Sequence, residues 1–333
     1  FIAIKDVGKN YLFDQFVDMI GFFETPIELP QDSLKFPVLF KEETNFRWGR
    51  PRYVNDHHLE FGYFGDVSDK KILFTEAFKQ KGKGFFTRDR EKDTLHYWFQ
   101  PVKDLDSIVV ALEEKDSMRP VVIKPFKPEL DSLMLSLSPK NLNVLHFLDT
   151  LKIESNLPIM AVNDEYIQIF DIDTLSIPFT SSIDPNKDKV YLEFEKVQND
   201  NYRIQILPNA ITDFIGATND TIIHSVRTQA IENYGSLFLT VENKNKDMPY
   251  FFELIDKNGN LIRKVNQNED DRYELKYLLP KDYQIRFVKD HNGNGQWDTG
   301  NYLEKRQPEE VIYLADYLSL RANWDLIETF TIE

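Results

Sequence analysis

Short runs of alternating apolar and polar residues, separated by polar turns, constrain the fold of this chain more than any other feature. A period of two places successive side chains on opposite faces of a strand, so these runs predict half-buried β-strands. In residues 190–195 (VYLEFE), apolar and acidic side chains partly alternate, as in a strand with one face in solvent. The clearest runs are residues 59–63, 71–75, 95–99, 107–112, 189–195, 202–206, 236–242 and 250–255.

The turns between the runs favour sandwiches of short antiparallel strands. Residues 256–260 (DKNGN) hold an Asn-Gly pair between two apolar runs, which predicts a hairpin turn. Strand signals that recur at a spacing of roughly 8–12 residues are typical of Ig-like β-sandwiches. Helical periodicity is scarce, and we expect at most a turn or two at residues 213–216 and 308–317. The predicted fold class is therefore all-β, with tandem Ig-like β-sandwich domains.

Composition limits the classes of function. The 333 residues are 41% hydrophobic, which is enough for the cores of about two to four domains. A net charge of −15 disfavours binding to nucleic-acid phosphates or to an anionic membrane surface. The absence of cysteine excludes disulfides and thiolate metal sites, and no apolar run reaches 18 residues.

An internal repeat relates the two ends of the sequence. Residues 3–14 (AIKDVGKNYLFD) match residues 287–298 (FVKDHNGNGQWD) in a strand, an Asp, an Asn four residues later, and an aromatic residue followed by Asp. We therefore expect the sequence to begin inside one module, whose upstream part is missing, and to end with a complete module of the same kind. The predicted domain ranges are 1–30 (tail of a β-sandwich module), 31–128 and 129–227 (Ig-like sandwiches) and 228–333 (a small sandwich carrying the Asp/Asn loop).

The Asp/Asn loop at residues 290–298 (DHNGNGQWD) is the best candidate metal site. Ca²⁺ prefers six to eight oxygen ligands, which a tight loop supplies from alternate positions, with Gly at the sixth for the turn. The twelfth position is Asn301 rather than Glu and the flanks are strands, so this is not an EF-hand; Glu304 is a candidate distal carboxylate. The alternative is an Asx/Gly-rich turn without metal. The pattern assigns a structural Ca²⁺ to Asp290, Asn292, Asn294, the Gln296 carbonyl and Asp298.

The matching loop near the start is a weaker metal candidate. Gly8 removes one ligand, Tyr11 replaces the turn glycine, and Asp18 lies nearby. A turn stabilised by side-chain hydrogen bonds is the default interpretation. The candidate ligands that keep their places are Asp6, Asn10 and Asp14.

The triplet Asp-Ser/Thr-apolar occurs eight times, against roughly one occurrence expected from average residue frequencies. It resembles the O-glycosylation acceptor of Bacteroidota envelope proteins. The alternative is turn chemistry, in which the Asp-Ser pair makes a turn and the apolar residue begins a strand. The candidate glycosylation sites are Ser33, Thr94, Ser107, Ser117, Ser132, Thr150, Thr174 and Thr221.

Known enzyme motifs are missing from the sequence. It has no Gly-x-Ser-x-Gly elbow, no P-loop and no His-Glu-x-x-His zinc motif. The six histidines are scattered, and the neighbours His57 and His58 would point to opposite faces of a strand. We therefore interpret the histidines as surface or structural residues and expect no enzyme.

One aromatic group, beside Arg47, Arg50 and Arg52, has two interpretations. It is either a sugar-binding platform or part of a sandwich core with its rim, and the core is favoured. The group consists of Trp48, Tyr53, Phe61, Tyr63 and Phe64.

The end of the chain resembles a known family. Residues 290–302 (DHNGNGQWDTGNY), 307–309 (QPE) and 321–325 (RANWD) are similar to the C-terminal signature of Bacteroidota Ig-like domain-containing proteins, many of them outer-membrane lipoproteins. Residues 202–213 resemble the late strands of a bacterial Ig-like domain. The resemblance implies a bacterial Ig-like domain at 129–227 and a transthyretin- or Cna-B-like sandwich at 228–333. It also implies a further Ig-like domain and a lipobox Cys upstream, and no catalytic activity.

The expected function follows from this resemblance. We expect a non-enzymatic lipoprotein of the cell envelope that acts as a scaffold or accessory subunit of an outer-membrane complex for assembly, secretion or uptake. The expected partner is an outer-membrane β-barrel protein, and the membrane is reached only through an upstream lipid anchor. Whether the periplasmic or the surface face carries the protein stays open. The alternative is a surface carbohydrate-binding or adhesion module.

Overall fold

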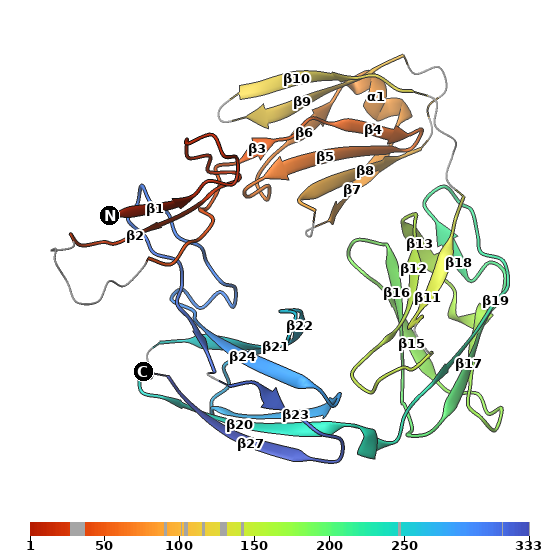
Figure 1. Cartoon of the computed structure of the whole chain (residues 1–333). Helices are drawn as coiled ribbons and strands as arrows, with labels where there is room; N and C mark the ends of the chain where they lie inside the picture. Colours follow the sequence, from red (N-terminus) through yellow and green to blue (C-terminus); the bar gives the residue numbers. More distant parts are fainter. Residues whose placement is uncertain are drawn as a thin grey trace. The chain divides into compact units, whose positions relative to one another are not determined.

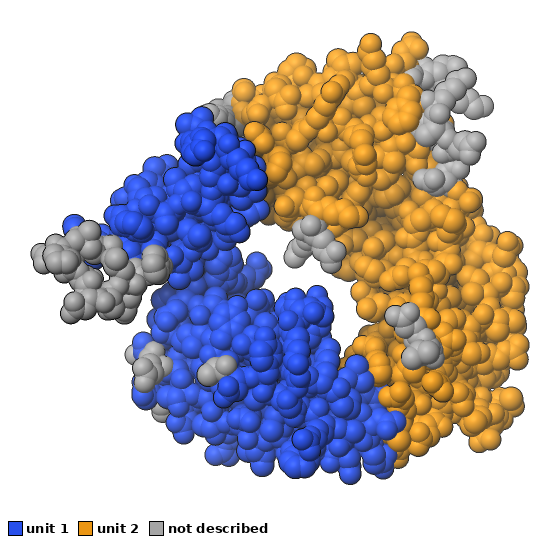
Figure 2. All heavy atoms as spheres, in the orientation of Figure 1, with its two compact units in different colours: residues 1–44, 231–333 blue, residues 45–230 orange. Residues whose placement is uncertain are grey.

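The computed structural model describes residues 1–26, 37–89, 92–100, 102, 106–114, 117–126, 132–140, 143–245, 248–314 and 316–332. The all-β prediction is confirmed, because in these residues helix is limited to α1 (Glu76–Lys81) and two short 3-10 turns, Asp164–Tyr166 and Ile231–Asn233. The chain divides into two compact units, residues 1–44 with 231–333 and residues 45–230, coloured blue and orange in Figure 2. None of the described helices is long and apolar enough to cross a membrane.

The first sandwich of the 45–230 unit has an aromatic core. Its strands are β3 (Arg47–Trp48), β4 (Arg52–Asn55), β5 (His58–Phe64), β6 (Ile72–Phe74), β7 (Gly84–Asp89), β8 (Thr94–Phe99), β9 (Ile108–Glu114) and β10 (Ser117–Ile123). One sheet has the order β3-β5-β8-β7, with β4 also paired to β5, and the other has the order β10-β9-β6 (Figure 1). Alternation in β5 buries Leu59, Phe61 and Tyr63 in this core, where Phe78 of α1 joins them.

The second sandwich of this unit has an aliphatic core. Its strands are β11 (Leu135–Ser138), β12 (Leu151–Ser155), β13 (Ile159–Val162), β14 (Ile167–Phe170), β15 (Phe179–Ile183), β16 (Lys189–Phe194), β17 (Asn201–Ile206), β18 (Ile211–Asp213) and β19 (Ile222–Arg227). The sheet orders are β11-β12-β16-β15 and β14-β17-β19, with β13 and β18 as a separate pair. Val190 and Leu192 of β16 pack with Ile204 of β17, so the alternating runs 189–195 and 202–206 are strands as predicted.

The terminal sandwich lies in the other unit. Its strands are β20 (Gly235–Asn243), β21 (Tyr250–Asp256), β22 (Leu261–Asn266), β23 (Arg272–Leu278), β24 (Asp282–Lys289), β25 (Val311–Tyr313), β26 (Leu318–Ser319) and β27 (Asp325–Ile332). The orders are β23-β20-β27 and β22-β21-β24-β25, with β26 also on β24, and β27 runs parallel to β20. The predicted hairpin joins β21 to β22: Asp256 Oδ1 accepts the amides of Asn258 and Asn260, and Gly259 has φ +81°.

The described residues of 1–44 include a small antiparallel ribbon in the same unit. Strands β1 (Ile2–Lys5) and β2 (Met19–Phe22) are antiparallel, and Ile20 of β2 forms a bridge with Phe40. Ile20, Phe22 and Phe40 are buried together, with Tyr302 of the terminal module packed against them. The first and last parts of the sequence thus share a hydrophobic cluster.

Two local predictions differ from the structure. Residues 308–317 hold β25 instead of a helical turn, because Ile312 packs against the terminal core from the sheet edge. The run 71–75 gives only the three-residue strand β6, since α1 follows from Glu76.

The four predicted domain ranges stay predictions. The aromatic, aliphatic and terminal cores draw their residues from within 31–128, 129–227 and 228–333 respectively. The boundaries after residues 30 and 128 lie outside the described residues, and the Ile20–Phe40 bridge crosses the first of them.

Candidate functional site

The Asp/Asn loop follows directly from β24 and is organised by Asp290. This carboxylate is 4% exposed; its Oδ1 accepts the Asn294 amide at 3.1 Å and its Oδ2 accepts the Gly295 amide at 2.7 Å. An Asp side chain that accepts backbone amides further along the chain fixes a turn in the same way as an Asx turn. Asp290 is therefore a structural centre of the loop.

A second buried carboxylate closes the loop, and it is not the predicted one. Glu309 is 7% exposed; its Oε1 accepts the His291 amide at 2.8 Å and its Oε2 accepts the Asp298 amide at 3.0 Å. Glu304, the predicted distal carboxylate, instead pairs with Arg306 at 3.4 Å. The spacing of residues in the sequence did not predict Glu309 as the second carboxylate, because the chain makes the turns of residues 301–306 before it returns to the loop.

Among the predicted ligands, the structure brings the side chains of Asn292, Asn294 and Asp298 together. Asn292 Nδ2 and Asn294 Nδ2 donate to Asp298 Oδ2 at 2.6 and 2.9 Å, and Asn294 Oδ1 accepts the Gln296 amide at 2.6 Å. Carboxylate and amide oxygens are the ligand types that Ca²⁺ takes, and rotation of an Asn amide exchanges its oxygen and nitrogen. The donor set therefore fits Ca²⁺ in type, although Asp290 is engaged by backbone amides and Lys264 Nζ donates to the Gly295 carbonyl.

The loop near the start repeats this bonding. Asp6 accepts the amides of Asn10 (3.3 Å) and Tyr11 (2.7 Å), as Asp290 accepts those of the matching residues. Asp18 takes the place of Glu309 and accepts the amides of Val7 and Asp14, each at 2.8 Å. Hydrogen bonds from the backbone amide of Asp14, and then of Val7 and Gly8, lower the pKa of Asp18. The internal repeat is thus a repeat of structure.

The third candidate ligand of this early loop, Asp14, does not bond to Asp6 or Asn10 in the described contacts. Its Oδ1 accepts the Phe16 amide at 2.9 Å. Asn10 Oδ1 accepts the Leu12 amide at 2.8 Å, so these side chains stabilise turns, as the default interpretation of this loop expects.

Residues 40–43 attach the start of the sequence to the segment after the Asp/Asn loop. Buried Glu42 accepts the Tyr302 amide, and Arg306 Nη2 pairs with Glu43 Oε2 at 2.7 Å. The Glu43 amide donates to the Gly300 carbonyl. A Cβ at Gly300 would lie 2.6 Å from the Phe40 ring, so this close approach requires glycine.

The predicted aromatic group is mostly core. Trp48, Tyr53, Phe61 and Tyr63 are at most 4% exposed, and only Phe64 is well exposed, with the Arg47 guanidinium 5.0 Å from its ring centre. A sugar-binding platform needs exposed ring faces, so this group does not offer one.

Among the described glycosylation candidates, Ser107, Thr150 and Thr221 directly precede strands, whereas Thr94 and Ser117 are the first residues of β8 and β10. Ser107, Ser117, Ser132, Thr174 and Thr221 are exposed, Thr94 and Thr150 are half-buried, and Ser33 lies outside the described residues. The apolar residue of the triplet begins β9, β12 and β19, as turn chemistry expects. Modification of these hydroxyls stays a prediction.

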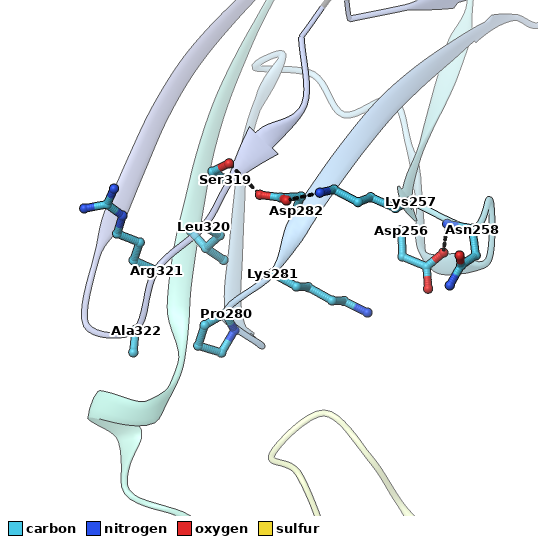
Figure 3. Close-up of a pocket in the computed structure, with 10 residues that line it drawn as sticks. All are labelled: Asp256, Lys257, Asn258, Pro280, Lys281, Asp282, Ser319, Leu320, Arg321 and Ala322. Carbon is cyan, nitrogen blue, oxygen red and sulfur yellow. Dashed lines mark hydrogen bonds and ion pairs between the residues drawn. The ribbon is translucent and has the colours of Figure 1, made fainter.

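A surface pocket of about 650 Å³ beside the start of β24 combines charged and hydroxyl side chains (Figure 3). Asp282 accepts a hydrogen bond from Ser319 and pairs with Lys257 at 2.6 Å, as the dashed lines show. The Lys257 ammonium first, and then Ser319, hold the pKa of Asp282 below its ordinary value, which makes the carboxylate a weak base.

Comparisons with known proteins find fold likeness only. No family model and no curated protein matches the chain. Among solved structures, it is similar to the Bacillus anthracis TIE protein (11% identity, TM-score 0.21, 62% of this chain and 41% of that one). It is also similar to native α-2-macroglobulin from Escherichia coli spanning domains MG0-NIE-MG1 (13% identity, TM-score 0.27, covering 55% of this chain and 72% of that one). A third similar structure is that of the N-terminal four Ig domains of Dscam1 isoform 8.4 (8% identity, TM-score 0.20, covering 85% of this chain and 78% of that one).

Proposed function

We propose that this chain is a non-enzymatic structural module of the cell envelope, serving as a scaffold or accessory subunit of an outer-membrane protein complex. The observation that carries the proposal is the use of the buried carboxylates Asp18, Glu42, Asp290 and Glu309. Each accepts a backbone amide that fixes a loop or joins the two ends of the sequence. Carboxylates held in this way stabilise structure and are poorly placed for proton transfer.

Rigidly held loops on β-sandwiches suit contacts with other proteins. Scaffolds of this kind present binding residues on loops that a stable core positions. The net charge of −15 supports a protein partner over nucleic acid. The lipid anchor and the outer-membrane location belong to the proposal through the resemblance of residues 290–325.

Affinity purification from native membranes tests this function. The chain, fused to a purification tag, should recover an outer-membrane β-barrel protein that a tagged, unrelated β-sandwich does not recover. Recovery of the chain alone in repeated purifications under mild detergent would contradict the proposed role.

The proposal includes a structural Ca²⁺ in the Asp/Asn loop. We expect Ca²⁺ to raise the melting temperature of the unit that contains residues 231–333, and EDTA to lower it again. Asp298→Asn should lose this response, whereas the matched change Asp14→Asn in the other loop should keep it. An unchanged melting curve with EDTA, together with no bound metal by elemental analysis, would refute calcium at residues 290–298.

A further inference from the structure

One face of the β5–β8 pair gathers histidines that lie far apart in the sequence. In the antiparallel register, His58 is opposite Trp98 and Glu60 is opposite His96. Alternate residues of a strand share a face, so these four side chains lie together, away from the core side of Leu59 and Phe61. The neighbouring strands β5 and β8 are labelled in Figure 1.

The distances between the ligand atoms are those of a nearly closed metal site. His58 Nε2 lies 2.8 Å from His96 Nδ1, and His96 Nδ1 lies 3.9 Å from Glu60 Oε1. In this group each residue offers one ligand atom, and all of these atoms lie within 4.8 Å of one another. Zinc–nitrogen bonds of about 2.0–2.1 Å place two tetrahedral nitrogens about 3.4 Å apart, and the His58–His96 and His96–Glu60 distances each differ from that spacing by roughly half an ångström.

Neighbouring side chains hold the three ligands in place. The His58 ring stacks on Trp98 with a centroid distance of 3.8 Å and an interplanar angle of 11°, and Trp98 Nε1 donates to Thr87 Oγ1 at 3.0 Å. Arg52 Nε donates to Glu60 Oε2 at 2.9 Å, while Glu60 Oε1 is the oxygen nearer to His96. Such outer contacts fix ligand orientation in metal sites.

The surroundings of both imidazoles lower their pKa values and so favour the neutral form. Burial, and then the charges of His96, His57 and Arg52, lower the pKa of His58 to about 3. Burial lowers the pKa of His96 as well, with Lys92 acting in the same direction and Glu60 and Asp89 against it. Neutral imidazole carries the lone pair that binds a metal ion.

An ion can reach this group from solvent. The side chains of His96 and Glu60 are 19% and 22% exposed. His96 and Trp98 also line a cavity of about 470 Å³ whose wall includes Asp188. An open position beside three protein ligands leaves room for a water molecule as the fourth ligand.

We propose that His58 Nε2, His96 Nδ1 and a carboxylate oxygen of Glu60 bind one divalent transition-metal ion of the zinc class. Two imidazoles and one carboxylate are a donor set that suits Zn²⁺, whereas Ca²⁺ prefers oxygen ligands alone. The site lies in the 45–230 unit and is independent of the Asp/Asn loop.

Calorimetric titration of the tag-free, metal-stripped full chain with Zn²⁺ at pH 7.5 tests the site. We expect one ion per chain, and binding at least tenfold weaker in His96→Ala. His291→Ala removes an exposed histidine of the other unit and should bind zinc like the unchanged chain. Absence of zinc binding, or equal affinity in His96→Ala, would overturn the proposal.

A second variant distinguishes the loss of a zinc ligand from the loss of the fold. Glu60→Gln keeps the size of the side chain, and the ion pair that it removes involves Arg52 with a 69% exposed side chain, so the fold should be little affected. It should weaken zinc binding about tenfold while the zinc-free melting temperature stays near that of the unchanged chain. A heat signal from Ca²⁺ that disappears in His96→Ala would contradict the assignment to the zinc class.

Discussion

The two Asp loops share the backbone amide bonds that their first Asp and a later carboxylate accept, although their sequences differ. The backbone is left-handed at Lys9 (φ 54°) and Tyr11 (φ 61°) in the first loop, and at the matching Gly293 (φ 68°) and Gly295 (φ 69°) in the second. Glycine adopts this conformation without strain, whereas other residues disfavour it by about 1–2 kcal/mol. The carboxylates that accept the backbone amides, and not the glycines, therefore determine the path of the loop.

The loops differ also in how deeply the first Asp is buried. Asp290 is 4% exposed, whereas the bonds that Asp6 accepts are exposed to solvent. A buried amide that loses its partner costs more than an exposed one, which water can satisfy. The second loop should therefore depend more strongly on its Asp.

The largest expected effect is on stability when the first Asp is removed. Asp290→Ala should lower the free energy of unfolding of its unit by about 3 kcal/mol, and Asp6→Ala by about 1 kcal/mol. Urea unfolding, followed by hydrogen exchange of peptides from residues 231–332, measures the loss in free energy of unfolding for each of the two variants. Equal losses would show that burial does not distinguish the loops.

A smaller effect is expected at acid pH. Because the pKa of Asp18 is lowered in the folded state, its contribution is present above the ordinary Asp pKa of about 3.9 and is lost as pH falls through the folded pKa. The unit that contains residues 1–44 should lose stability as pH falls below about 4, and Asp18→Asn should flatten this dependence. Melting temperatures from pH 6 to pH 2 measure it, and parallel curves for the two proteins would count against Asp18.

The smallest expected effect is a change in stability on substitution at a left-handed position, and its sign differs between the two loops. Gly295→Ala should destabilise by about 1 kcal/mol because it places a Cβ at φ +69°. Tyr11→Gly should be neutral or slightly stabilising, since glycine relieves the left-handed strain. Thermal melts of both variants decide this, and a loss of stability in Tyr11→Gly would mean that the Tyr11 side chain matters more than its backbone.

Local chemistry made part of the site predictable. The Asp and Asn spacing predicted both loops; the sequence placed Asp18 near the first loop but did not predict that it accepts the Val7 and Asp14 amides. Contacts that depend on register between distant segments could not be predicted. Glu42 accepts the amide of Tyr302, 260 residues away, because Phe40 and Tyr302 pack in one cluster; His58 lies beside His96, 38 residues away, because β5 pairs with β8.

The sequence left two interpretations of the aromatic group open, a sandwich core or a sugar-binding platform, and the burial of its side chains in the structure favours the core. Trp48 and Tyr63 have the same chemistry in a core as on a sugar-binding surface, and only their position in the sandwich separates the two. The strand β25 was missed for a similar reason, because three residues carry too little periodicity to distinguish strand from helix.

Hydrogen–deuterium exchange of Asp290→Ala tests most directly whether the Asp/Asn loop holds the two ends of the sequence together. We expect faster exchange not only in residues 290–309 but also in residues 19–23 and 40–43, which contact the segment after the loop. Peptides from residues 45–230 should exchange as in the unchanged chain. Faster exchange confined to residues 290–298 would contradict the proposal that the loop holds the two ends of the sequence together.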